Sequence, residues 1–200
     1  MQFRVLSNLE TDVIDNFEEK IKTLDQHLET ERLNIKPLKA SDAVVAFPKL
    51  QDDDLYRWIS MSKPKSVDSL AGDWSRIESR ISPDRNEIWL AWFVTSKNDH
   101  SPVGSIDVSI DEDGVVVNFG YYFFVNEWGK GYGTEATSAV IHHLQKYQVK
   151  KFIATVTAGN TASVAVLNKL GFEFNRTIPN NDTLNGVLVD DDEYVLLTSR

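Results

Sequence analysis

The sequence predicts an α+β fold, and three observations lead to that prediction. Runs of strand composition alternate with runs of helical spacing along the 200 residues. Residues 115–125 form an apolar, aromatic and β-branched run that leads directly into a glycine-rich turn and a helical pattern. The hydrophobic content of 42% is ordinary for a globular protein and is sufficient for one buried core. One main domain is therefore expected.

The chain begins with a helical pattern in residues 1–28, interpreted here as an N-terminal amphipathic extension ahead of a main domain at 29–200. Its apolar residues recur at spacings of three and four: Val13, Phe17, Ile21, Leu24 and Leu28. Such a helix either docks on its own domain or forms a dimer or partner contact, and the pattern allows both. The segment has several acids and no continuous apolar run, which excludes a signal peptide or membrane span. These features predict a cytoplasmic protein with no membrane partner.

Three strands are expected before the glycine-rich turn, in addition to one at the start of the domain. The domain opens with a strand at 32–38, where apolar residues alternate with polar ones. Two further strands at 88–95 and 103–110 are joined by a polar loop. Residues 111–114 then form a turn into the central strand at 115–125.

Two helices are expected between the opening strand and the second one. The first is expected at 43–50, because Ser41 and Asp42 are good N-cap residues. The second is expected at 66–79, with Pro83 in the turn that follows.

The run FVNEWGKGYGTEA at 124–136 predicts a phosphate site. It places Gly129, Gly131 and Gly133 between the central strand and a helical pattern. Glycines let a backbone approach a ligand closely, and the free amides of a first helical turn attract anions. The spacing fits neither the Walker loop nor the dinucleotide fingerprint. Three glycines that serve only a tight turn are the alternative.

A second strand and helix follow the first. Residues 151–157 have strand composition, and a short helix is expected to follow them. Asn160 is a good N-cap for this helix and Gly171 a good residue just beyond its C-terminus.

Together the two units resemble the GNAT superfamily of acetyl-CoA-dependent N-acetyltransferases, in particular its RimJ/RimL-like ribosomal-protein acetyltransferase branch. The resemblance is carried by WGKGYGTEA at 128–136 and by N-x-x-S-x-x-V-L-x-K-L-G-F at 160–172. The opening ETERL at 29–33 and the closing hairpin around residues 184–198 are similar to that branch as well. The resemblance spans 29–200 and is specific for cofactor and fold, not for substrate.

The resemblance implies an α+β fold with a mixed, mostly antiparallel twisted sheet flanked by helices. It implies acetyl-CoA as co-substrate and transfer of the acetyl group to a primary amine by direct attack in a ternary complex. The acceptor is a protein or peptide N-terminal α-amine or a small-molecule amine. The alternative is a catalytically silent acyl-CoA-binding or interaction module. Two departures from the family pattern favour that alternative: Asn118 replaces a strand glutamate, and Leu167 replaces a helix tyrosine.

The resemblance also implies a set of cofactor contacts. Main-chain groups at the end of the central strand face the thioester and pantetheine arm, and residues 130–134 bind the pyrophosphate. Lys130 either adds charge there or is a solvated surface lysine. The expected cofactor-binding residues are Phe123, Phe124, Val125, Trp128, Gly129, Lys130, Gly131, Tyr132, Gly133, Thr134, Asn160 and Asn168.

The catalytic residues that the resemblance implies are Ser163 and Asn160, and Asp107 is added as a candidate base because Asn118 stands where relatives carry glutamate. The RimJ/RimL-like branch carries a serine at the position of Ser163, and its hydroxyl is expected either to protonate the departing sulfur or to donate a hydrogen bond to it. Asn160 contacts the cofactor, and the alternative is that it only caps the helix while Ser163 sits in the first turn. For the base, the sequence leaves Asp107, Glu127 and water open.

Composition limits the remaining partners. The formal net charge of −9 argues against nucleic acid and is compatible with a cationic acceptor. There are no cysteines, and His142 and His143 are adjacent on a helix, so no metal site is expected. The acidic run at 190–193 is interpreted as an exposed turn. Monomer and homodimer both remain open.

Overall fold

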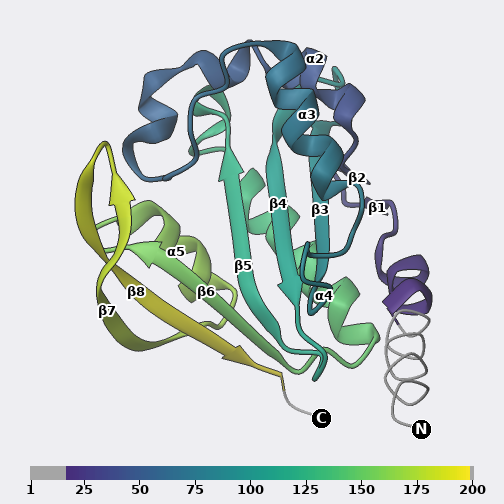
Figure 1. Cartoon of the computed structure of the whole chain (residues 1–200), viewed down its shortest axis with the longest axis vertical. Coiled ribbons are helices and arrows are strands. Elements are labelled where there is room, and N and C mark those ends of the chain that lie inside the picture. The colour runs from purple at the N-terminus through teal and green to yellow at the C-terminus, as the bar shows by residue number, and fades with distance from the viewer. Residues whose placement is uncertain (1–16, 199–200) are drawn as a thin grey trace, which may run out of the picture.

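The computed structural model describes residues 17–198 and contains one eight-stranded sheet with the strand order β1-β2-β3-β4-β5-β6-β8-β7 (Figure 1). Every neighbouring pair is antiparallel except β5 and β6, which are parallel. The strands are β1 (Leu28–Glu29), β2 (Leu33–Pro37), β3 (Ile88–Ser96), β4 (Pro102–Ile110), β5 (Val116–Phe123), β6 (Lys151–Thr157), β7 (Glu173–Leu184) and β8 (Val187–Leu197). The expected mixed, mostly antiparallel sheet is confirmed.

Helices cover both faces of this sheet. They are α2 (Ala43–Ala46), α3 (Val67–Ile77), α4 (Tyr132–Lys146) and α5 (Thr161–Lys169). The larger core joins α4 and α5 to one face and includes Val140, Leu167 and Phe119. The smaller core joins α2 and α3 to the opposite face and includes Trp74 and Phe124. Since strand side chains alternate, neighbouring residues of β5 serve different faces.

The sheet opens between its two parallel strands. Val116 and Phe152 are the only residues that pair β5 with β6, and beyond them the strands diverge (Figure 1). The two strands belong to the two units predicted from the sequence, so α4 and α5 begin on either side of the opening. The central strand is therefore separated from β6 at the end that leads into the glycine-rich turn.

Several boundaries differ from those expected. The helix expected at 43–50 ends at Ala46, and a 3₁₀ turn, Lys49–Gln51, follows Pro48. The central strand ends at Phe123 rather than at residue 125, because another 3₁₀ turn begins at Val125 and runs to Glu127.

The N-terminal pattern is partly confirmed. Residues 17–24 are helical, and Phe17 and Leu24 are buried in the larger core, so residues 17–24 dock on their own domain. Leu28 belongs to β1 rather than to the helix. Val13 lies outside the described residues.

An exposed turn was expected at the acidic run 190–193, but these residues belong to β8. Asp191 and Glu193 are buried, at 5% and 8% exposure. Partners on β7 make this burial possible, since Asn181 donates to Asp191 (2.8 Å) and Arg176 pairs with Glu193 (3.0 Å). Within residues 17–198, no helix combines the length and the apolarity needed to cross a bilayer.

Candidate active site

The glycine-rich turn is an open loop of main-chain donors at the start of α4. Gly129 and Gly131 have φ angles of 73° and 79°, which only glycine adopts without strain. Within the described chain, none of the main-chain N–H groups of residues 129–134 donates a hydrogen bond to a protein atom. Successive unpaired N–H groups beside a helix N-terminus form an anion site.

Side chains just ahead of β2 hold this glycine-rich loop in place through hydrogen bonds. Arg32 donates from Nε to Oε2 of Glu135 (2.6 Å) and from Nη1 to the carbonyl of Lys130 (3.0 Å). Thr30 donates to the other oxygen of Glu135 (2.5 Å), and the Arg32 guanidinium lies 4.6 Å from the Tyr132 ring centroid. Burial acts to raise the pKa of Glu135, but the hydrogen bonds from Thr30 and Arg32 hold this pKa below its ordinary value.

Sequence reasoning missed the role of Arg32, because it used ETERL only as a signature of the opening strand. Arg32 and Glu135 are 103 residues apart, so no local pattern connects them. The signal available in the sequence was Thr30 and Arg32 just ahead of a strand, together with Glu135 in the first turn of the helix after the glycine-rich loop.

Lys130 is not a free cation. Its Nζ pairs with Oε2 of Glu127 at 3.0 Å, and the Glu127 side chain is only 10% exposed. Glu127, one of the candidate bases, is therefore already engaged in an ion pair beside the loop.

At the end of β5 the main chain offers donors toward the opening. Phe124 donates its N–H to the carbonyl of Val103 on β4 (2.9 Å). Because antiparallel hydrogen bonding alternates, the N–H of Phe123 points away from β4 and toward the opening. The Phe123 carbonyl accepts from the exposed Trp128 indole (2.6 Å). Of the three expected residues, Phe123 and Val125 remain as donors, whereas the Phe124 amide is used within the sheet.

The second unit places Asn160 and Ser163 as expected for a capped helix. Asn160 Oδ1 accepts from the Ser163 N–H (3.2 Å), and Ser163 Oγ lies 2.8 Å from the hydroxyl of Tyr121 on β5. Tyr121 therefore connects the two sides of the opening. Burial raises the pKa of Tyr121 to about 12 despite the hydrogen bond with Ser163. Asn168 is exposed near the end of α5, and its side chain has no hydrogen bond among the described residues.

Asp107 lies on the opposite face of the sheet. Its carboxylate occupies the space over Gly120, where an added Cβ would be 2.7 Å from Oδ2, and Asn118 donates to it at 3.2 Å. Burial raises the pKa of Asp107 to about 6, and the Asn118 hydrogen bond offsets part of this effect. Burial, together with the charge of Asp107, raises the pKa of the neighbouring Tyr122.

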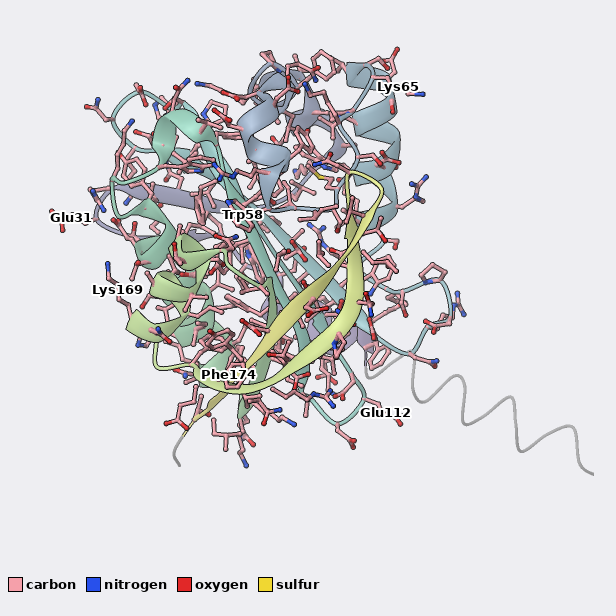
Figure 2. All side chains as sticks on the ribbon, turned by 90° about the vertical axis from the view of Figure 1, so that its left-hand side faces the viewer. Glu31, Trp58, Lys65, Glu112, Lys169 and Phe174 are labelled. Atoms are coloured by element: carbon pink, nitrogen blue, oxygen red, sulfur yellow. The ribbon has the colours of Figure 1, made fainter. Side chains whose placement is uncertain are left out.

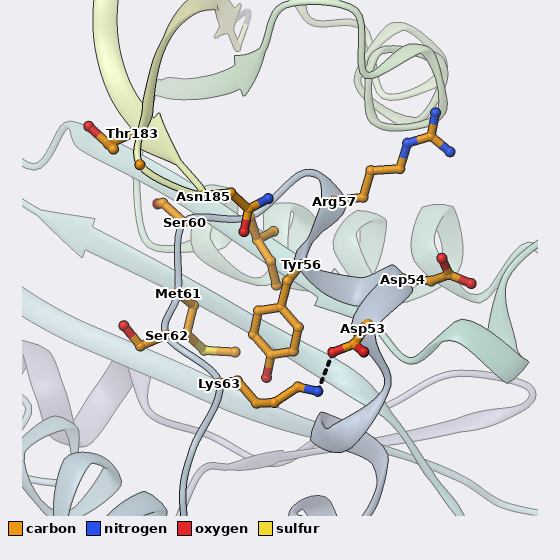
Figure 3. A pocket seen from close by; sticks show the side chains of 12 residues that line it. Asp53, Asp54, Tyr56, Arg57, Ser60, Met61, Ser62, Lys63, Thr183 and Asn185 are labelled. Atoms are coloured by element: carbon orange, nitrogen blue, oxygen red, sulfur yellow. Dashed lines mark hydrogen bonds and ion pairs between the residues drawn. The ribbon is translucent and has the colours of Figure 1, made fainter.

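A pocket of ≈ 730 Å³ lies on this second face, between residues 53–63 and the β7–β8 turn (Figure 3). Tyr56 and Met61 line it from one side and Asn185 from the other, while Lys63 pairs with Asp53 at its rim. Trp58, seen near the middle of the molecule in Figure 2, belongs to the same segment 53–63. Its ring packs 3.7 Å from the Cβ position of Gly159, just before Asn160.

A sheet that opens between two parallel strands, with a glycine loop of unpaired N–H groups at the start of the helix that connects them, is the architecture that the resemblance to acetyl-CoA-dependent acetyltransferases implies. The chain matches the family described as Acetyltransferase (GNAT) domain over residues 32–173, and it belongs to that family. The resemblance seen in the sequence is thereby confirmed, and the protein is an acetyl-CoA-dependent acetyltransferase that acts on an amine.

Named relatives agree with this assignment. The chain is 25% identical over 165 residues to "Uncharacterized N-acetyltransferase p20" of Bacillus licheniformis, covering 82% of this chain and 91% of the relative. It is similar to RimL, a ribosomal L7/L12 alpha-N-protein acetyltransferase solved with coenzyme A, with TM-score 0.77, 14% identity and coverage of 86% and 98%. Ribosomal-protein-S5-alanine acetyltransferase of Vibrio fischeri has TM-score 0.75, 20% identity and coverage of 86% and 97%. These two structural likenesses concern the fold.

The residues present fit acetyl-CoA, the co-substrate of the family. The unpaired N–H groups of residues 129–134 match a diphosphate, and Arg32, whose charge is paired with Glu135, supports the loop by donating to the Lys130 carbonyl. A Cβ on Gly133 would lie 3.3 Å from the Phe123 ring, so this helical turn can pack closely against the strand end. The first turn of α4 therefore lies directly beside the end of β5.

Proposed function

We propose that the protein transfers the acetyl group of acetyl-CoA to a primary α-amine of a protein, a peptide or a small molecule, by direct attack in a ternary complex. The observation that carries this proposal is the opening between β5 and β6. It joins a face that bears the glycine loop and Ser163 to a face that bears Asp107. Two substrates that enter from opposite faces can meet there without a covalent enzyme intermediate.

Acetyl-CoA supplies an activated acetyl thioester, and the loop and strand end hold it. In this proposal residues 129–134 bind the diphosphate with their free N–H groups. The N–H groups of Phe123 and Val125 stabilise the charge that develops on the carbonyl oxygen. Asn160 has its oxygen in the helix cap, which leaves its amide donors for the cofactor.

Asp107 is the proposed general base, acting directly or through a bound water. Its pKa of about 6 makes it a stronger base than an ordinary aspartate while it stays ionised at neutral pH. Its position on the pocket face is where the amine would arrive. Glu127, the other acid considered, is paired with Lys130.

The proposed acceptor class follows from amine chemistry and agrees with the names of two structural neighbours. An α-amine has a pKa near 8 and is about one-tenth neutral at pH 7, whereas lysine, near 10.4, is neutral in fewer than about one molecule in a thousand. A single base with a pKa of about 6 suits the α-amine. RimL is named a ribosomal L7/L12 alpha-N-protein acetyltransferase, and the other neighbour is named a ribosomal-protein-S5-alanine acetyltransferase.

The direct test measures release of the CoA thiol from acetyl-CoA with a panel of N-terminal peptides, small α-amines, polyamines and Nα-blocked lysine peptides. We expect release with at least one α-amine and about 10-fold or more lower kcat/KM with blocked lysine peptides. CoA binding without thiol release for any acceptor would instead support a silent acyl-CoA-binding module.

Ser163→Ala separates catalysis from binding. We expect kcat to fall about 10- to 100-fold, because a hydrogen bond to a departing thiolate is lost, while CoA affinity by calorimetry stays within about twofold. Asn160→Ala is the comparison variant and should cost about 1 kcal/mol of stability through loss of the helix cap. Unchanged kcat in Ser163→Ala would remove the proposed role of this hydroxyl.

A further inference from the structure

We infer that Tyr121 is a positioning residue for thiol departure, because its phenol fixes the Ser163 hydroxyl as a hydrogen-bond donor toward the sulfur. This inference rests on the proposed function of the site. It adds a residue from the central strand to a role that the sequence had placed only on α5.

The contact is specific in its geometry. Tyr121 follows the point where β5 and β6 separate, yet its hydroxyl reaches α5, 2.8 Å from Ser163 Oγ and 3.2 Å from the Ser163 carbonyl. The ring is held between Phe119 and Phe123, with centroids 6.3 Å and 6.0 Å away. The hydroxyl is thus fixed by packing as well as by its hydrogen bonds.

The protons in this contact can be counted. Ser163 Oγ has no hydrogen-bond partner other than Tyr121 within residues 17–198. Each hydroxyl carries one proton. When the single phenol proton of Tyr121 is shared between Ser163 Oγ (2.8 Å) and the Ser163 carbonyl (3.2 Å), the serine proton is not used in this contact. The opening is where the sulfur of the thioester would lie, so that proton is available to it.

The role is hydrogen bonding rather than full proton transfer. A thiol has a pKa of about 8.5, far below the pKa of about 12 for Tyr121. When the C–N bond forms and the C–S bond breaks, the electron pair moves to sulfur and the thiolate accepts a hydrogen bond from Ser163. The proton lost by the amine goes to Asp107 or water, and the free thiolate is protonated by solvent after release.

This arrangement explains why α5 functions without a tyrosine of its own. Leu167, at the position where many family members carry tyrosine, is fully buried in the larger core. A phenol from β5 meets the same helix one turn earlier, at Ser163. The strand therefore supplies the aromatic hydroxyl that the helix lacks.

The test variant is Tyr121→Phe, which keeps the ring and removes only the hydroxyl. The matched control is Tyr194→Phe, a buried tyrosine on β8 whose hydroxyl has no hydrogen bond among the described residues. One measurement is independent of turnover: the pKa of the thiol of bound CoA, followed by thiolate ultraviolet absorbance. We expect Tyr121→Phe to raise this pKa by about 0.5 to 1 and to lower kcat about 3- to 10-fold, with KM for acetyl-CoA unchanged.

Tyr121→Phe and Ser163→Ala also form a double-mutant cycle. Since Tyr121 acts through Ser163, Tyr121→Phe should have no further effect on kcat or on the thiol pKa in a Ser163→Ala background. Unchanged thiol pKa and kcat in Tyr121→Phe, or additive effects in the double variant, would overturn the inference. Absence of turnover in the wild type would remove the proposed function, and the thiol pKa in the CoA complex would still decide the role of Tyr121. Melting temperatures show whether each variant is folded.

Discussion

Replacing Asp107 with asparagine is expected to lower kcat/KM for the amine by about 100-fold or more at pH 8, while making the protein more stable. The loss follows because a positioned general base contributes about 10²- to 10⁴-fold and asparagine cannot accept the proton. Asparagine has nearly the same shape and can still pair with Asn118, so the sheet should remain intact. The measurement is kcat/KM against pH from 5 to 9 with the best acceptor of the panel. In the wild type it should fall below about pH 8 as the amine is protonated and fall more steeply below about pH 6, as Asp107 is protonated too.

The gain in stability comes from removal of the negative charge that Asp107 carries in a buried place. Burial raises the pKa of Asp107 from 3.8 to about 6, so folding disfavours the ionised form. This penalty is absent below the unfolded pKa and fully present above about pH 6. The two-unit difference corresponds to at most about 3 kcal/mol, and partial solvent access reduces it to about 1–2 kcal/mol. Urea unfolding should show Asp107→Asn more stable than the wild type at pH 8 and equal to it at pH 3.

The control for this prediction is Asp113→Asn, in the exposed turn between β4 and β5, which should change neither quantity. If Asp107→Asn kept its kcat/KM and its acid limb, the base would be Glu127 or water, and Glu127→Gln would be the next variant. If only the activity fell, the raised pKa would be wrong while the catalytic role would stand.

Local features of this fold were predictable because their causes are local. The strand β6 was predicted at its observed bounds, and Asn160 and Gly171 cap α5 as expected. Each depends on a few neighbouring residues. The glycine loop was predictable for the same reason, since positive φ and a helix start can be recognised from glycine spacing.

Features that join distant segments could not be predicted in this way. Ser163 and Tyr121 are 42 residues apart, and their contact depends on how far β5 and β6 diverge. The acidic run at 190–193 was misinterpreted because acids in sequence usually face solvent. Here Arg176, on the adjacent strand β7, neutralises Glu193. The raised pKa of Asp107 likewise comes from strands that pack around it.

The second large effect is expected for Arg32→Met, which should weaken CoA binding about 10-fold or more and destabilise the protein. The variant keeps the aliphatic stem but removes the ion pair with Glu135 and the hydrogen bond to the Lys130 carbonyl. The Glu135 side chain is only 19% exposed, so its charge would remain without a cation close to the diphosphate loop. Leaving a buried carboxylate unpaired costs about 3–5 kcal/mol, and partial exposure reduces this to about 1–3 kcal/mol. Calorimetry with CoA and urea unfolding measure the two effects.

A matched control separates the effect of Arg32 on CoA binding from its effect on the stability of the protein. Arg176→Met breaks a similar ion pair, with Glu193, whose side chain is 11% exposed on the β7–β8 hairpin. It should lose comparable stability but keep its CoA affinity, because the hairpin is not part of the glycine loop. Glu135→Gln combined with Arg32→Met should bind CoA more tightly than Arg32→Met alone, since the unpaired negative charge of Glu135 is then gone. If Arg32→Met bound CoA as the wild type does, the glycine conformations alone would hold the loop, and Arg32 would serve only to attach β2 to α4.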